Sequence, residues 1–247
     1  NFNYAKINNY ASKYVSGDAI LLLNNDTEFT HENWGKELIS NVLRPGIGFV
    51  GVKLIYQDKT IQHAGVILGI GGTAGHVHKF INYKERGYFN RLQCSQEFSA
   101  LTAACLAISV ENWDKLSGFD ESNFNVNYTD VDICLRARSL RLRNIYLPNV
   151  IVYHYESKTR GKPEYEAYRE WQIEKNNMLS IWKKLIYDDP YYNPNLKLIS
   201  EDFSIGLRSL SSIKPRTICD IIFNNLGLIY RKFHFILIHE TRNKRWY

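Results

Sequence analysis

The most constraining feature of the chain is a five-residue apolar run that ends in three polar residues. Residues 19–23 read Ala-Ile-Leu-Leu-Leu, and Asn24, Asn25 and Asp26 follow directly. A short apolar run of this kind predicts a buried strand of a parallel sheet. Because ligands of open α/β sheets bind beyond the carboxyl ends of the strands, we expect these polar residues to face a ligand. Asp26 suits a hard divalent cation, although the same residues are also suited to capping a following helix.

A second acidic segment, Thr129-Asp130-Val131-Asp132, opens a predicted helix. Helix chemistry alone accounts for it, because Thr129 suits the N-cap, Asp132 suits the capping-box position, and acids favour the positive end of the helix dipole. The functional alternative is that one carboxylate accepts a proton from a hydroxyl group. Asp130 and Asp132 are two residues apart and point in different directions on a helix, so they are not expected to share one role.

Helical and strand patterns alternate along most of the chain, which predicts an α/β fold. Helices are expected at residues 3–16, 31–43, 111–116, 129–140 and 164–185, and further strands at residues 48–54, 145–147 and 150–154. A glycine-rich segment, residues 69–72, lacks the spacing of a dinucleotide-binding motif and is expected to form a loop near a ligand.

The cysteine and histidine spacing predicts neither a disulfide framework nor a zinc site. The four cysteines form no CxxC pair, so we expect buried free thiols in a reducing compartment. His76 and His78 have no cysteine or glutamate at metal-binding spacing, and His154 ends a predicted strand alone.

The excess positive charge lies entirely in residues 203–247, where 8 basic and 2 acidic residues give 8 − 2 = +6. Within this tail, residues 218–238 are apolar but interrupted by charges such as Arg231 and Lys232, which argues against a membrane-spanning helix. An amphipathic helix on an anionic membrane surface is one hypothesis, and a helix packed on the rest of the protein or on a second copy is the other. Nucleic acid is not favoured, because the charge is not spread along a groove-sized face.

Taken in order, several segments resemble the bacterial family 2 glycosyltransferases, the GT-A enzymes that build O-antigens, capsules and rhamnose-containing wall polysaccharides. Each segment is short, and the ordered set over roughly residues 1–204 carries the resemblance. The segments are residues 17–28, Gln62-His63-Ala64-Gly65, residues 74–79, Thr102-Ala103-Ala104-Cys105, Gly118-Phe119-Asp120-Glu121, residues 130–136, residues 153–157 and residues 190–194. The resemblance implies a GT-A-like mixed sheet flanked by helices.

The resemblance also implies roles for particular residues. Asn24, Asn25 and Asp26 stand at the DxD motif that binds the nucleotide diphosphate with Mn²⁺ or Mg²⁺, and Asn24 replaces its first Asp. His154 matches a position that completes the metal site, and Asp130 matches the general base. Contacts to the acceptor or donor are implied for Asp132, His63, His76 and Arg136. The implied reaction is inverting transfer of a sugar from a nucleotide-sugar to a hydroxyl of a glycan or a lipid-linked glycan.

The strand–helix units with which this family usually begins have no counterpart in the chain. We therefore expect residues 1–202 to be the acceptor-side part of a GT-A domain, residues 203–247 to form a basic amphipathic helical tail, and the chain alone to bind nucleotide-sugar poorly. The expected location is the cytoplasm, with association at the inner face of the cell membrane. The rival hypothesis is a non-catalytic remnant or interaction module, and a phosphohydrolase would need more clustered acids than Asp26 provides.

Overall fold

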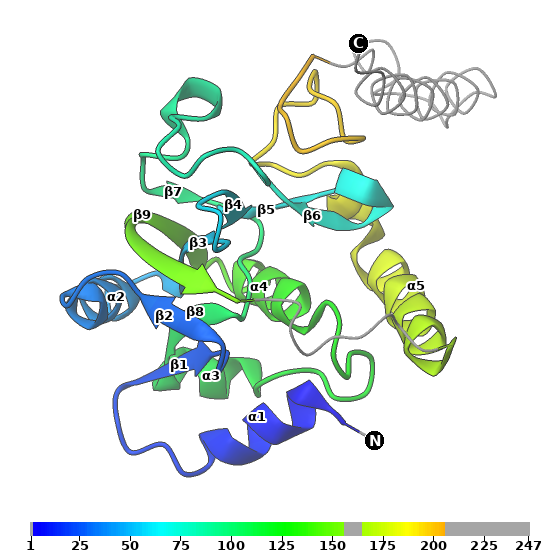
Figure 1. The fold of residues 1–247 in the computed structure, drawn as a ribbon. Helices are drawn as coiled ribbons and strands as arrows, with labels where there is room; N and C mark the ends of the chain where they lie inside the picture. The colour runs from blue at the N-terminus through cyan, green and yellow to red at the C-terminus, as the bar shows by residue number, and fades with distance from the viewer. Residues whose placement is uncertain (1, 156–164, 206–247) are drawn as a thin grey trace, which may run out of the picture.

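A seven-stranded mixed sheet forms the centre of the protein in the computed structural model, which describes residues 2–155 and 165–205 (Figure 1). The strand order is β1-β8-β3-β9-β2, with β4 on β3 and β7 on β9. These strands are β1 (Ala19–Leu23), β2 (Thr27–Phe29), β3 (Ile47–Ile55), β4 (Ile61–His63), β7 (Gln96–Glu97), β8 (Cys105–Ser109) and β9 (Arg143–His154). The mixed α/β architecture confirms the predicted fold class.

The strand that carries the polar residues is not the buried parallel strand that its apolar run predicts. β1 pairs only with β8 and does so antiparallel, so it forms one edge of the sheet within the described residues. Leu23 is 43% exposed, whereas every residue of β3 is buried. The run of leucines reflects burial of alternate side chains against helices, and its composition does not distinguish an edge strand from a central one.

Helices cover both faces of the sheet. They are α1 (Tyr4–Ser12), α2 (Trp34–Val42), α3 (Val110–Leu116), α4 (Thr129–Ser139) and α5 (Tyr165–Tyr187), and all five predicted helices are confirmed to within a few residues. On one face, Leu38 and Val42 of α2 pack against Val50 and Val52. On the other face, α3 and α4 pack against the sheet, and α1 and α5 lie outside them (Figure 1). This two-sided burial explains why β3 is apolar except for Lys53, which is itself buried.

The two strands expected at residues 145–147 and 150–154 are one continuous strand, β9. It runs parallel to β3, and the register shifts where Val52 pairs with Leu147 but Lys53 pairs with Ile151. Pro148 lies in the three residues left over by this shift. Proline has no N–H to donate to a ladder and is tolerated in a strand at a bulge. The break that the sequence suggests is therefore a bulge inside one strand.

The glycine-rich segment is more regular than the loop we expect from its composition. β5 (Val66–Leu68) and β6 (Ala74–His76) pair antiparallel, and the 3₁₀ turn Ile70–Gly72 joins them. Gly69 precedes this turn with φ +87°, and a Cβ atom there would lie 2.6 Å from the carbonyl oxygen of Ile186. Gly69 is thus required both by the backbone angle and by the close approach of the C-terminal end of α5.

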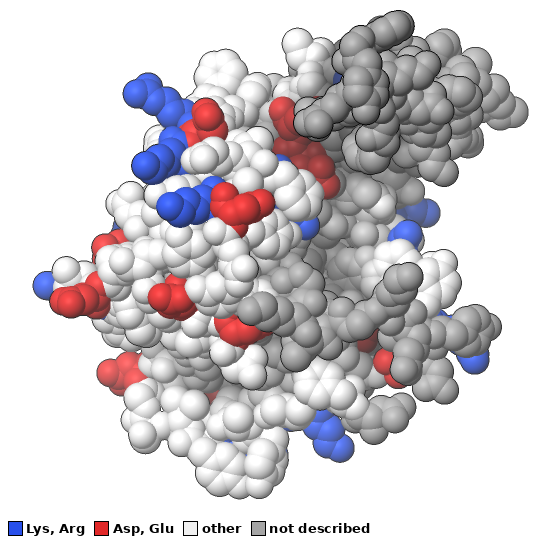
Figure 2. All heavy atoms as spheres, in the orientation of Figure 1, with Lys and Arg blue, Asp and Glu red and all other residues white. Residues whose placement is uncertain are grey.

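The remaining predictions concern the cysteines, membrane-spanning helices and the charged tail. Cys105 and Cys134 are buried free thiols as expected, whereas Cys94 is exposed. No helix in the described ranges is long and apolar enough to cross a membrane. Basic and acidic side chains are interspersed on the face shown in Figure 2. The expected amphipathic helix at residues 218–238 lies outside the described residues.

Candidate active site

The metal side of the site is built where β2 pairs with the end of β9. Thr27 pairs with His154, and the Tyr155 N–H donates to the Asp26 carbonyl oxygen at 2.9 Å. This pairing brings the Asp26 side chain to the His154 ring, with Oδ1 3.1 Å from Nε2. Asn24, at the end of β1, places its Nδ2 3.1 Å from the same Nε2. The structure therefore brings together three of the residues predicted to bind the metal and diphosphate. Asn25, between Asn24 and Asp26, is part of the same turn.

The hydrogen bonds of His154 define which nitrogen carries the proton. Gln62 Oε1 lies 2.6 Å from Nδ1 and only accepts, so Nδ1 carries the hydrogen. Asn24 Nδ2 only donates, so Nε2 is an acceptor. The unprotonated Nε2 thus lies close to the Asp26 carboxylate oxygen, and Oδ1 is buried with no hydrogen-bond partner among residues 2–155 and 165–205. Two electron-rich atoms placed this way would attract a cation.

These residues fit a divalent cation as a partial ligand set. An imidazole nitrogen and a carboxylate oxygen both ligate Mn²⁺, and a Gln that bonds the other ring nitrogen fixes the tautomer that ligation needs. In the described part of the chain, no group of three or more His, Cys, Asp and Glu side chains is arranged to hold a metal. The pair would therefore hold the ion together with ligand oxygens and water, as Mg²⁺ is commonly held between carboxylates and phosphates.

Asp130 lies at the N-terminus of α4. Its Oδ2 accepts a hydrogen bond from the Ala103 N–H at 3.1 Å, and its Oδ1 accepts one from the Val131 N–H at 2.9 Å. Burial raises the pKa of the Asp130 carboxyl above its usual range, and the hydrogen bonds from Ala103 and Thr102 offset part of that rise. A raised pKa strengthens the carboxylate as a proton acceptor.

Helix capping does not explain these acids. The N-cap of α4 is Tyr128, in the left-handed conformation at φ 59° and without a side-chain cap, so Thr129 is not the cap. The N-cap of α2 is Asn33, which leaves Asn24 and Asp26 away from the start of that helix. The capping alternative is thus wrong for both acidic segments.

The two acidic positions lie at the same end of the β1–β8 pair. Leu23, the last residue of β1, pairs with Cys105, the first residue of β8. The Asn24 N–H donates to the Ala104 carbonyl oxygen at 3.0 Å, and the neighbouring Ala103 N–H holds Asp130. A short path of main-chain and side-chain bonds therefore connects the Asp26–His154 pair to Asp130.

The side chains of Asp132 and Arg136 form hydrogen bonds inside the protein. Asp132 is 2% exposed, and its two oxygens accept from Arg136 Nε at 2.8 Å and Trp182 Nε1 at 2.9 Å. Arg136 also donates to the carbonyl oxygens of Leu116 at 2.7 Å and Gly118 at 2.8 Å. This geometry favours a role in fixing α4 over direct contact with a ligand.

His63 and His76 form a close pair on neighbouring strands, with their Nδ1 atoms 2.7 Å apart. Burial, followed by the positive charges of neighbouring groups, lowers the pKa of His63 well below its usual value and lowers the pKa of His76 to about 4. His63 Nε2 is buried without a partner among the described residues. Because His63 follows Gln62 on β4, the pair adjoins the metal side of the site.

Reasoning from the sequence assigned no role to Gln62, Ala103 and Thr102, although their segments were part of the family resemblance. Gln62 fixes the tautomer of a residue 92 positions away, and Ala103 acts through its main-chain N–H. Neither contact leaves a local pattern. Both contacts join segments that are far apart in the chain, so one sequence carries no signal for them.

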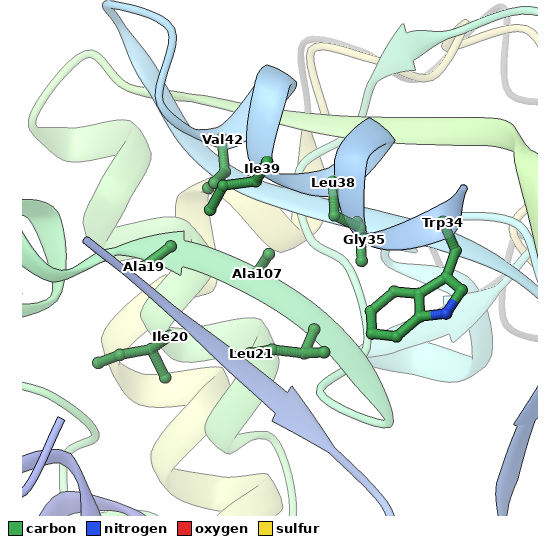
Figure 3. Close-up of a pocket in the computed structure, with 9 residues that line it drawn as sticks. All are labelled: Ala19, Ile20, Leu21, Trp34, Gly35, Leu38, Ile39, Val42 and Ala107. Atoms are coloured by element: carbon green, nitrogen blue, oxygen red, sulfur yellow. The ribbon is translucent and has the colours of Figure 1, made fainter. Parts of the chain in front are cut away.

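An apolar pocket lies apart from these residues, beside the outer edge of β1 (Figure 3). Its volume is about 160 Å³. Residues of β1, α2 and β8 line it: Ala19, Ile20, Leu21, Trp34, Gly35, Leu38, Ile39, Val42 and Ala107. With no ionisable residue in its lining, the pocket offers packing surface at the edge of the sheet and no catalytic group.

The chain is similar in sequence to a protein of O-antigen biosynthesis and in fold to a solved glycosyltransferase structure. No protein-family model matches the chain. It is 41% identical over 208 residues to the uncharacterized protein y4gI of Sinorhizobium fredii, covering 83% of this chain and 23% of that protein. It is 37% identical over 219 residues to the O-antigen biosynthesis protein RfbC of Myxococcus xanthus, covering 84% of this chain and 16% of that protein. The chain thus spans less than a quarter of each curated relative.

Among solved structures, the chain resembles GalNAc-T7, whose crystal structure contains UDP, GalNAc and Mn²⁺. The TM-score is 0.54 at 11% identity, covering 76% of this chain and 35% of that one. At this level of identity the likeness shows the fold alone. The fold is therefore a GT-A-like mixed α/β fold, as predicted.

Proposed function

We propose that this chain is the acceptor-side part of a metal-dependent, inverting glycosyltransferase of the family 2 type that acts in surface-polysaccharide assembly. The observation that carries the proposal is the close approach of Asp26 Oδ1 and His154 Nε2, at the same end of the β1–β8 pair as the partly buried Asp130, the proposed base. The 37% identity to a protein of O-antigen biosynthesis supports the same activity.

Asp26 and His154 would hold Mn²⁺ or Mg²⁺ against the diphosphate of the donor. When bound, such an ion stabilises negative charge on a departing diphosphate. Asn24 and Asn25 stand in the same turn, and Asn24 orients His154 through its amide. Gln62 keeps Nε2 free of its proton, so that the lone pair faces the ion.

Asp130 acts on the acceptor. It takes the proton of an acceptor hydroxyl as that oxygen forms a bond to the anomeric carbon of the donor sugar. The bond from this carbon to the diphosphate oxygen breaks, and its electron pair leaves with the nucleotide diphosphate. A single displacement inverts the anomeric configuration. His63 and His76 adjoin the metal side and would contact the donor or acceptor, while Asp132 and Arg136 would act by holding α4 in place.

The outer edge of β1 is the place where the donor side would be completed. Its backbone groups are unpaired within the described residues, and the apolar pocket lies beside it (Figure 3). An unpaired apolar edge is a template for another strand. A strand–helix unit from outside the described residues would pair with β1 and fill the pocket.

The test is Mn²⁺-dependent turnover of a panel of nucleotide-sugars by the full-length protein, with Asp130→Asn as the control. Turnover that is lost in Asp130→Asn and on removal of the metal supports the proposal. A folded full-length protein that turns over no donor overturns it and favours the non-catalytic module. Transfer with retained anomeric configuration would contradict the single displacement.

A further inference from the structure

One buried carboxylate outside the site binds the loop that leads to the proposed base. Glu174 of α5 is 3% exposed. Its Oε1 accepts from the N–H groups of Asn125 and Val126, the latter at 3.0 Å. Its Oε2 accepts from the Asn127 N–H at 2.8 Å and from Asn127 Nδ2 at 2.7 Å. Consecutive main-chain N–H groups form a concave site for an anion, and here a side chain of the protein fills it.

The loop held by Glu174 directly precedes α4. Asn127 is three residues before Asp130, and the intervening N-cap, Tyr128, makes no side-chain cap. The start of this helix is therefore not fixed by its own sequence. Glu174 satisfies three N–H groups just ahead of it, and these groups would otherwise lose their partner in a partly buried environment.

Other residues of α5 bind the same loop and helix. Asn177 Nδ2 donates to the Asn123 carbonyl oxygen at 3.0 Å, and Trp182 Nε1 donates to Asp132 Oδ1 at 2.9 Å. The loop also meets α1, where the Ala5 N–H donates to the Asn125 carbonyl oxygen at 3.1 Å. These contacts hold the loop from two sides, and Glu174 is the charged group among them.

We propose that Glu174 is a positioning residue for the base: by binding the loop of residues 125–127, it sets where the Asp130 carboxylate stands. This inference rests on the proposed glycosyl transfer. The distance from the Ala103 N–H to Asp130 Oδ2, 3.1 Å, depends on where α4 begins. A displacement of about 1 Å at a reacting group can reduce a rate by about 100-fold. Glu174 touches neither metal ligand, so binding of the donor should not depend on it.

The experiment compares Glu174→Gln with Glu170→Gln in the full-length protein. In Glu174→Gln the side-chain NH₂ would face the two donors of Asn127, so that two of the four hydrogen bonds to this side chain are lost. Glu170 is exposed on the same helix, and its substitution makes the same change of charge. We expect Glu174→Gln to lower kcat by about 10- to 100-fold with KM for the nucleotide-sugar unchanged. Amide hydrogen exchange at residues 125–127 should become faster, and Glu170→Gln should change neither quantity.

Each outcome decides the inference. Unchanged exchange at residues 125–127, or faster exchange with unchanged kcat, overturns the positioning role while the proposed function stands. A rise in KM that accounts for the whole loss also overturns it. No turnover by the unmodified protein overturns the proposed function and, with it, the role of Glu174. If Glu174→Gln does not fold, Glu174→Asp replaces it, because a shorter carboxylate keeps the charge but cannot reach all three N–H groups, and the same loss of kcat is expected.

Discussion

His154 Nε2 lies 3.1 Å from Asp26 Oδ1, and no hydrogen bond joins them because the ring hydrogen is on Nδ1, facing Gln62, and Nε2 accepts from Asn24. A buried carboxylate oxygen without a donor is unusual in a native fold, because the unmet group costs about 1–3 kcal/mol or more. A cation bound to both atoms would satisfy this carboxylate oxygen.

The first prediction concerns Gln62. Replacing it with Leu removes the acceptor for the Nδ1 hydrogen of His154, so the ring loses the contact that fixes its tautomer and orientation. Partners of this kind typically contribute 10–100-fold in metal affinity. We expect Gln62→Leu to weaken Mn²⁺ binding in the presence of a nucleoside diphosphate by about tenfold or more, measured by calorimetry. Gln57→Leu, an exposed glutamine, is the control. Equal affinities in both variants would contradict the proposed role of His154.

The second prediction concerns catalysis by Asp130. Asp130→Asn keeps an oxygen to accept the Ala103 N–H but cannot take a proton. We expect kcat to fall by about 10²–10⁴-fold, the range for general-base catalysis, with a smaller change in KM. In the unmodified protein, kcat should decline with falling pH as Asp130 becomes protonated. Because burial raises its pKa, this decline should begin at a higher pH than for an exposed aspartate.

The same substitution should affect stability in the opposite direction. A carboxyl whose pKa is raised by folding stabilises the protein below its unfolded pKa, and this contribution is lost as the pH rises through the folded pKa. Near neutral pH, Asp130 is therefore a partly buried charge that disfavours folding. We expect Asp130→Asn to raise Tm at pH 7, and we expect this gain to shrink as the pH falls through the raised pKa of Asp130 and to disappear below the pKa of an ordinary aspartate. A lower Tm of Asp130→Asn at pH 7 would show that favourable contacts in the folded protein outweigh the cost of burying the Asp130 carboxylate.

The third prediction separates a role for Arg136 in holding α4 from a role in binding a ligand. Arg136→Ala leaves Asp132 without its ion-pair partner and two carbonyl oxygens without a donor. Removing one partner of a buried pair costs about 3–5 kcal/mol. Lys115→Ala breaks a pair with Glu111 that is largely exposed and should cost much less stability, because solvent screens exposed ion pairs. Urea unfolding measures both. A small loss of stability with a large rise in KM would instead assign Arg136 to the ligand.

The sequence was sufficient to predict the helices and most strands of the fold, but not which strands pair with each other. Apolar runs and helix signals located β3, α4 and α5, because burial and periodicity are local properties. That β1 is an antiparallel edge strand depends on pairing with β8, more than 80 residues away. The two strands predicted at residues 145–147 and 150–154 are one strand because the bulge around Pro148 depends on pairing with β3, which is not a local property.

The same distinction applies to the site. The residue type alone shows that a side chain can ligate a metal or accept a proton. The sequence could therefore identify Asp26, His154 and Asp130 as candidates. Gln62, Ala103 and Glu174 act through contacts between distant segments, in one case through a main-chain N–H. Such roles follow from the three-dimensional arrangement, and one sequence without that arrangement contains no pattern for them.

The fourth prediction concerns membrane association, which depends on residues outside the described part of the chain. If residues 218–238 form a basic amphipathic helix, the chain should sediment with vesicles containing anionic phospholipid, and added salt should weaken this binding. A version that ends at residue 205 should remain in the supernatant. Neutral vesicles are the control for the electrostatic part. Equal behaviour of both versions on anionic vesicles would contradict the hypothesis.

The last prediction concerns the outer edge of β1. If a further strand–helix unit completes the donor side there, this chain alone should bind nucleotide-sugar much more weakly than the full-length protein, as measured by calorimetry with Mn²⁺ present. In the full-length protein, Ile39→Asp would place a charge in the pocket that this unit should fill (Figure 3). We expect it to weaken donor binding, because burying an unpaired charge is costly. Lys36→Asp, on the exposed side of the same helix, is the control. Full affinity in this chain alone would show that the donor site needs no unit beyond β1.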